Sequence, residues 1–447
     1  NIKAHFKSKL PLAALDEAGR KHQRKPDDGS ADEKKISPND IADKILRDYA
    51  VINVDKYLYE YTQNYWKSIS DDRLKALAVQ YEGKAKTSMR RRAEVSSYIQ
   101  ATTHRSHQQW RILEPYEIPV AGGVVDIRSM AVRPHRETDM LRACIPIEYN
   151  PRAQASVLMK TLDTYFGGDD DGENKISAIQ EFFGYCLMPH ALYKKALCCF
   201  GESNCGKSTI PFLIRELIGI ENISSVPLED MHDSRKIAPM MGKMVNLLGD
   251  LPQNGVIGEG GFQKLVSVGE TLQFDPKYLP PVEEISTCKV LFCANPPLPK
   301  IGDQSKAMYE RLLLVRFLYE IPRLEQDRGI QAKLSTEREG LLLWALEGAQ
   351  RLFLADGQFT TVGQKELKAY REEQNPINDF ITDECEVEPD VKTPVSDLHS
   401  KFLKWYGRPI TPQYFCQLVR GAGFEITKNP VWIGTRKTRA AIGLRLS

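Results

Sequence analysis

The sequence has 447 residues, enough for about two to four domains of ordinary size. Its hydrophobic share of 42% and charged share of 27% are those of a folded globular protein, and its net charge of +2 by itself predicts no nucleic-acid partner. No run of about 18 apolar residues occurs and no signal peptide opens the chain, so we expect no membrane partner and a cytoplasmic protein, in the host cytoplasm if a phage encodes it.

The nine cysteines form no C-x-x-C pair and no cluster with zinc spacing. Several of them lie inside apolar runs, where cysteine behaves as a small hydrophobic residue. We therefore expect reduced, buried thiols and not metal ligands.

The first 195 residues fall into three segments that differ in composition and hydrophobic pattern. Residues 1–35 are polar without a hydrophobic period, which predicts a linker or partly ordered arm. Residues 36–150 open with a helix, since Ser37 precedes Pro38, and continue with short β-rich runs typical of a small α+β domain. Residues 151–195 are a mainly helical lead-in, and their acidic stretch GGDDDGENK is expected to be a surface turn, because it lacks the glycine register of an EF-hand loop.

The sequence pattern predicts three further parts in the rest of the chain. In residues 196–322, apolar strand-like runs alternate with helices, which favours a three-layer α/β domain with a mostly parallel sheet. Residues 323–390 predict a helical subdomain. Residues 391–447 give two helices followed by paired β-like runs, a pattern that suggests a winged-helix-like domain.

The stretch GESNCGKS fits the phosphate-binding pattern G-x-x-x-x-G-K-[ST]. A strand-length apolar run precedes it and a helical spacing of apolar residues follows, which is the context that the pattern requires. Lys207 would reach the β and γ phosphates of ATP, and the Ser208 hydroxyl would bind Mg²⁺. The residues expected to surround the nucleotide are Gly201, Glu202, Ser203, Asn204, Cys205, Gly206, Lys207, Ser208 and Thr209.

Two later apolar runs end in polar residues that could take part in ATP hydrolysis. KMVNLLGD ends in Asp250, the candidate for holding the metal and its water. Many P-loop motors carry a second acid beside the first, but Gly249 stands there, so either Asp250 serves both roles or Glu259 or Glu270 comes in from a loop. CKVLFCAN ends in Asn295, whose amide can hydrogen-bond both the γ-phosphate and the attacking water.

With these motifs in order, the sequence resembles a superfamily 3 helicase of the AAA+ class, and in particular the helicase part of poxvirus-type and phage-type primase-helicases. The resemblance rests on the phosphate loop, VNLLGD, GFQKLVSVGETLQFDPKYLPP, VLFCANPPLP and DQSKAMYERLLLVRF. It implies a P-loop AAA+-type ATPase domain, flanked by the N-terminal α+β domain and the winged-helix-like domain, in a hexameric ring that moves single-stranded DNA. It also implies a site shared between subunits, completed by Arg311 of the neighbour, with Arg316 as the alternative.

Two groups of basic residues are candidates for binding DNA. The resemblance implies that Lys264 and Lys277 face the DNA in the central pore. In the tail, residues 396–447 hold nine Lys and Arg against two Asp and Glu, an excess of seven positive charges. The tail candidates are Arg420, Lys428, Arg436, Lys437 and Arg439.

The sequence thus predicts an ATP-dependent replicative DNA helicase from a phage or mobile element, acting on fork or origin DNA. An ATP-switched origin-binding or loading protein that does not unwind DNA is the alternative, and a small-molecule P-loop kinase is disfavoured because it has no use for the flanking domains. No paired-carboxylate primase centre is visible, so primer synthesis would belong to an upstream domain or a partner.

Overall fold

The computed structural model describes residues 36–447 apart from short stretches, namely 63, 84–86, 107–112, 137–138, 252–255, 258–259, 268–269, 302–305 and 408. The arm expected over residues 1–35 and the candidate acid Glu259 lie outside the described residues. The chain forms two compact units, one of Asn1–Glu148 with Asp275–Val282 and one of Tyr149–Phe274 with Glu283–Ser447. In the described part of the chain, no helix is long and apolar enough to cross a membrane.

The first unit begins with helix α2 (Pro38–Asp48), which starts where the sequence predicts. Ser37 Oγ accepts a hydrogen bond from the Asp40 N–H at 3.1 Å, and the Asp40 carboxylate accepts one from the Ser37 N–H at 3.0 Å, which makes a capping box. An apolar core joins this helix to α3 (Asp71–Glu82) and α4 (Met89–Thr102). The adjoining sheet has the order β3-β2-β1-β4, with strands Tyr65–Ile69, Tyr57–Thr62, Val51–Val54 and His104–Arg105.

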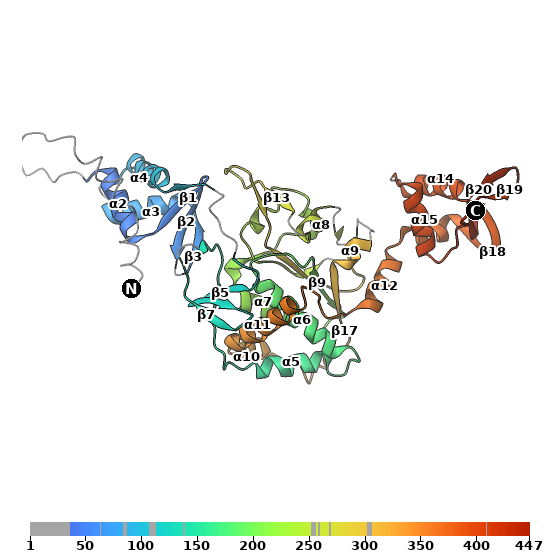
Figure 1. The fold of residues 1–447 in the computed structure, drawn as a ribbon, viewed down its shortest axis with the longest axis horizontal. Helices are drawn as coiled ribbons and strands as arrows, with labels where there is room; N and C mark the ends of the chain where they lie inside the picture. The colour runs from blue at the N-terminus through green and yellow to red at the C-terminus, as the bar shows by residue number, and fades with distance from the viewer. Residues whose placement is uncertain are drawn as a thin grey trace, which may run out of the picture. The chain divides into compact units, whose positions relative to one another are not determined.

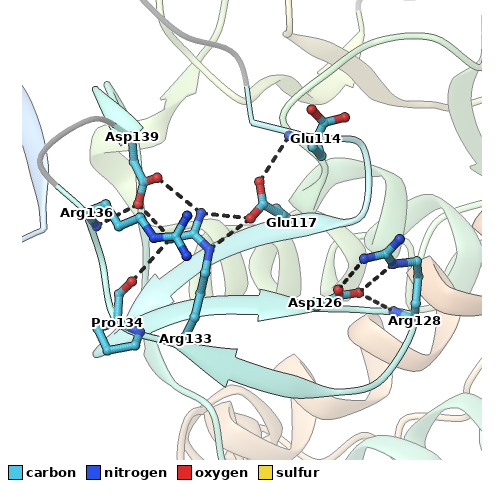
Figure 2. A network of polar contacts seen from close by, with 8 residues as sticks. All are labelled: Glu114, Glu117, Asp126, Arg128, Arg133, Pro134, Arg136 and Asp139. Carbon is cyan, nitrogen blue, oxygen red and sulfur yellow. Dashed lines mark hydrogen bonds and ion pairs between the residues drawn. The ribbon is translucent and has the colours of Figure 1, made fainter.

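A second sheet of the first unit is held by ion pairs at its strand ends. Its order is β7-β6-β5-β8, with strands Ala131–Arg133, Gly123–Asp126, Glu117–Ala121 and Ile145–Glu148. Figure 2 shows the Arg133 guanidinium between two carboxylates, 2.9 Å from Asp139 and 2.8 Å from Glu117. Burial works to raise the pKa of Asp139, but the hydrogen bonds from the Arg133 side chain and the Arg136 N–H, together with the nearby positive charge of Arg133, lower that pKa on balance. The network therefore ties β7 to β5 and to the loop before β8.

The second unit is built around a five-stranded parallel sheet of order β10-β11-β15-β9-β17. The central strands β9 and β15 are buried along their whole length, which agrees with their continuous apolar sequences. The predicted mixed α/β fold with a parallel sheet is thus confirmed. In sheet order the strands are Ile223–Ser224, Val245–Leu251, Lys289–Ala294, Ala196–Gly201 and Leu312–Phe317.

Helices α6 (Gly172–Leu187), α7 (Thr209–Ile218) and α11 (Arg338–Leu354) pack together beside this sheet (Figure 1). Gly184 of α6 and Ala349 of α11 are in close contact, since a Cβ built on Gly184 would lie 2.2 Å from the Ala349 nitrogen. The remaining helices of this part are α5 (Ser156–Phe166), α8 (Gly261–Leu265), α9 (Lys306–Glu310), α10 (Ile330–Ser335) and α12 (Gln364–Glu373). Two short strand pairs complete it, Val256–Ile257 (β12) with Lys300–Ile301 (β16) and Thr271–Phe274 (β13) with Val282–Ile285 (β14).

The acidic stretch at residues 167–175 is mostly exposed, as expected of a surface turn, but its last residue is buried. Lys175 is 2% exposed, and its ammonium donates to Asp169 at 2.5 Å and to the Arg316 carbonyl at 2.9 Å. Burial raises the pKa of Asp169 and the hydrogen bond from Lys175 lowers it, with a net lowering. Lys175, at the end of this largely exposed stretch, therefore connects the first turn of α6 to the end of β17.

The C-terminal part has its own apolar core, which includes Ile377, Phe380, Phe402, Phe415 and Val419. Because Ile377 and Phe380 belong to it, this core begins in α13, and the boundary expected at 390/391 falls inside β18. Antiparallel pairing joins β18 to β21, and β19 to β20. The elements are α13 (Pro376–Glu384), β18 (Cys385–Pro394), α14 (Val395–Tyr406), α15 (Pro412–Gly421), β19 (Val431–Ile433), β20 (Arg436–Thr438) and β21 (Ala440–Leu446).

Candidate functional site

The loop GESNCGKS runs from the end of β9 to the start of α7, as the sequence predicts. Gly206 has φ +90, and a Cβ at this position would lie 2.6 Å from the Tyr165 ring, so only glycine fits. Asn204 also has a left-handed φ of 61. These two residues turn the backbone sharply before the helix, the arrangement in which N–H groups can converge on a phosphate.

Lys207 lies across its own loop. Its ammonium donates to the carbonyl oxygens of Gly201 at 2.6 Å and Glu202 at 2.5 Å, and it is 3.4 Å from the Cys205 sulfur. These contacts hold the positively charged ammonium of Lys207 over the loop. A phosphate oxygen bound there could attract the ammonium away from the two carbonyls.

A cavity of about 280 Å³ brings the loop together with the ends of two other strands. Its wall contains most of the residues expected to bind nucleotide, and also Asp250 and Asn295 from far along the chain. The lining residues are Ser203, Asn204, Cys205, Gly206, Lys207, Ser208, Gly249, Asp250 and Asn295.

The sheet order explains why Asp250 and Asn295 meet. Strand β15 lies between β9 and β11, so Asn295, directly after β15, stands between the loop and Asp250. Nδ2 of Asn295 is 3.4 Å from Oδ1 of Asp250, a long hydrogen bond. The pairing of β11 with β15 shifts register between Leu248 and Leu251, so Gly249 and Asp250 form a bulge. A bulge redirects side chains, and here Asp250 lines the cavity.

There is space for a side chain at Gly249, the position where a second acid would be expected. A Cβ added to Gly249 would meet only Nη2 of Arg215, on α7, at 3.9 Å. Of the two alternative acids, Glu259 lies outside the described residues, and Glu270 is exposed and does not line either described cavity.

A larger cavity of about 610 Å³ adjoins the other side of the loop. It shares Asn204, Gly206 and Ser208 with the smaller cavity and is otherwise lined by Thr209, by α5 and by residues 321–333. Tyr165 contributes from α5, with its hydroxyl 2.8 Å from the Thr209 hydroxyl, and burial raises its pKa. The sequence did not single out Tyr165, because its spacing in α5 is that of an ordinary core residue.

Arg311 lies at the opposite end of the sheet from the loop. Its carbonyl accepts from the Ala196 N–H at 2.8 Å, so it stands where β9 begins, whereas the loop starts where β9 ends. The strand between them, β17, has six residues and spans about 20 Å. The Arg311 guanidinium donates to the Ala307 carbonyl at 2.6 Å and to the Ser267 hydroxyl at 3.3 Å. Arg316, in contrast, pairs with Phe200 next to the loop and is exposed.

The candidate pore residues lie in separate units. Lys264 is exposed in the last turn of α8, in the second unit. Lys277 is exposed in the first unit, with its ammonium 4.9 Å from the ring centroid of Tyr278. Tyr278 is 90% exposed.

The tail candidates are all exposed. Arg420 lies in the last turn of α15, and Lys428 follows in the segment before β19. Arg436 and Lys437 lie in β20, and the Arg439 Nε donates to the Thr427 carbonyl at 3.2 Å. In the described ranges, no group of three or more His, Cys, Asp or Glu side chains is placed to hold a metal ion.

Two protein families match parts of the chain. Residues 41–167 match the family described as D5 N terminal like. Residues 199–311, which run from β9 to Arg311, match a family of unknown function, DUF5906. Matches of these two kinds are typical of phage and viral primase-helicase proteins.

Solved structures of the C-terminal region of NrS-1 are similar to this chain. One A-form apo structure has a TM-score of 0.50 at 11% identity and covers 92% of this chain and 100% of that chain. Another has a TM-score of 0.48 at 13% identity and covers 91% and 100%. At this level of identity the likeness to the first concerns the fold alone. No curated protein matches the sequence.

Proposed function

We propose that this chain is an ATP-dependent replicative DNA helicase, encoded by a phage or another mobile element, with a P-loop AAA+-type ATPase domain of superfamily 3. The observation that carries the proposal is the meeting of Lys207, Asp250 and Asn295 in one cavity at the carboxyl ends of three parallel strands. Open α/β sheets bind their ligands at this edge. A lone phosphate-loop pattern would support only binding of a phosphate.

The two cavities fit the two ends of a nucleotide. Phosphates would occupy the smaller one, against the loop N–H groups and Lys207. The larger one, of about 610 Å³, has the size of a small-ligand pocket and would take the nucleoside. The loop residues shared by both cavities would then lie where the nucleoside is joined to its phosphates.

The residues of the smaller cavity also fit Mg²⁺. Ser208 and Asp250 present a hydroxyl and a carboxylate to one cavity, and hard cations of this kind prefer oxygen ligands. When bound, the ion would neutralise charge on the β and γ phosphates. Lys207 would bind the same phosphates, Asn295 would orient the attacking water by its amide, and Asp250 would accept a hydrogen bond from that water or from a metal-bound one.

A ring of identical subunits would complete the site. Because Arg311 is about one strand length from the loop of its own chain, it can reach a γ-phosphate only in a neighbouring chain. This placement supports a homo-oligomer, which we propose to be a hexamer. Lys264 and Lys277 would bind the DNA backbone in its pore, and the winged-helix-like tail would bind fork or origin DNA.

One observation favours the second candidate, an ATP-switched origin-binding or loading protein. Gly249 leaves the site with one strand-end acid, and a site that binds ATP firmly but activates water weakly suits a switch better than a motor. Both candidates use the same nucleotide site, so unwinding itself separates them.

The test is a strand-displacement assay on a forked DNA, with ATP and DNA binding measured in parallel. We expect the wild type to unwind, and Lys207→Ala to lose both ATP binding and unwinding. Lys243→Ala is the matched control, because its ammonium also donates to a backbone carbonyl, that of Glu221, away from the cavity. A wild type that binds ATP and DNA without unwinding would rule out the helicase and support the loader.

A further inference from the structure

The hairpin β19–β20 carries an exposed tryptophan. Trp432 is 69% exposed, and it stands directly opposite Lys437 in the antiparallel register. Two residues join the strands, and the first of them, Gly434, has φ +58. A tight turn of this kind fixes the register of a hairpin, so the aromatic ring and the ammonium stay on the same face.

The surroundings of the ring are positive. Lys437 shares its face, Arg436 lies opposite Ile433 on the other face, and Arg439 follows two residues later. Residues 396–447 carry nine Lys and Arg against two Asp and Glu, an excess of seven. A protein-binding surface built around tryptophan is usually depleted in lysine at its centre, so this combination fits an anionic partner better than a protein.

We infer that this hairpin binds single-stranded DNA, with the Trp432 indole stacked on an unpaired base and Lys437 bound to a neighbouring phosphate. The inference rests on the proposed function for taking DNA as the partner. An exposed aromatic face beside a cation is the pairing with which proteins hold unpaired bases, since every base offers a π face. In a duplex the base faces are covered by their neighbours.

The two residues therefore do different things. Lys437 attracts phosphates, which both single and double strands offer, and its contribution falls as salt rises. Trp432 gains a partner only where a base is unstacked. The hairpin would accordingly prefer the single strand beside a fork over duplex DNA, a preference that the basic residues of the tail cannot provide alone.

The experiment uses the full chain with a thymidine oligonucleotide and a duplex of equal length. We expect Trp432→Ala to weaken binding to the oligonucleotide by about 5- to 150-fold and to leave binding to the duplex unchanged. Lys437→Ala should weaken both and reduce the salt dependence of both. Tryptophan emission should be quenched by the oligonucleotide in the wild type, and this quenching should diminish in Trp432→Phe, which retains an aromatic face and most of the affinity.

Val387→Ala is the matched control, since Val387 is a 63% exposed apolar residue in β18, outside the hairpin, and its loss should not affect binding. All variants should melt as the wild type does, because their side chains are exposed. Unchanged single-strand affinity in Trp432→Ala, or equal losses on single strand and duplex, would overturn the stacking role. If the wild type still unwinds DNA in that case, the proposed function stands; if it binds neither DNA, both fail.

Discussion

Asn295 and Asp250 lie side by side at the ends of neighbouring strands, with 3.4 Å between the amide nitrogen of one and a carboxylate oxygen of the other. They are 45 residues apart in sequence, and only the pairing of β15 with β11 brings them together. Both residues line the cavity that Lys207 also lines.

The first prediction concerns Asn295. We expect Asn295→Ala to lower the rate of ATP hydrolysis by about 10²- to 10³-fold, because it removes one positioned donor from the reacting groups. ATP binding should stay within a few-fold of the wild type, since Lys207 and the loop remain. Turnover and equilibrium binding of a fluorescent ATP analogue would be measured separately. An equal loss of binding and turnover would assign Asn295 to general nucleotide binding.

The second prediction concerns Gly249. Gly249→Glu should fold normally, because the nearest atom to its Cβ is Nη2 of Arg215 at 3.9 Å. Its carboxylate would supply the second acid beside Asp250, and we expect hydrolysis to rise by about tenfold or more if activation of water limits the rate. Gly249→Gln has nearly the same size without the charge and should not show the increase. Equal rates in the two variants would mean that Asp250 alone suffices.

The third prediction concerns Arg311. Arg311→Ala should bind ATP normally and lose about 10³- to 10⁵-fold in turnover, the effect typical of an arginine that neutralises the γ-phosphate. Mixing it with Lys207→Ala should restore part of the activity, because each variant supplies the half of the site that the other lacks. Arg316→Ala, close to the loop of its own chain, is the comparison. Absence of rescue in the mixture would contradict a site shared between chains.

The fourth prediction concerns Lys289, which is buried at the start of β15. Its ammonium donates to the Met188 carbonyl and lies 5.2 Å from the ring centroid of Tyr185. Burial lowers its pKa to about 8. Between this value and the ordinary lysine pKa, the unfolded chain binds a proton that the folded chain does not, so the stabilisation from Lys289 rises with pH over that window.

Melting of the wild type and of Lys289→Met at several pH values would check this expectation. Relative to the variant, the wild type should gain up to about 3 kcal/mol in unfolding free energy from pH 7 to pH 10. Lys243→Met is the control and should show no such change. A difference between wild type and Lys289→Met that stays constant with pH would show that Lys289 keeps its proton in the fold.

The sequence by itself determined the features that depend on neighbours along the chain. The loop from Gly201 to Ser208, the strand before it and the helix after it follow from local backbone requirements and hydrophobic spacing, and the helix start at Ser37 follows from its cap. The same holds for the order of Asp250, Asn295 and Arg311, since each is defined by the apolar strand next to it.

Only the tertiary structure decided which of these residues meet. Sheet order places Asn295 between the loop and Asp250. Arg311 lies at the opposite end of the sheet from the loop. A bulge in β11 directs Asp250 into the cavity, and the apolar pattern of the strand does not predict this bulge. The cavity beside Tyr165 and the buried Lys175 also come from contacts between distant segments. Such contacts leave no periodic signal in the sequence, because they join elements that are far apart along the chain. Their energy comes from packing and desolvation between these elements.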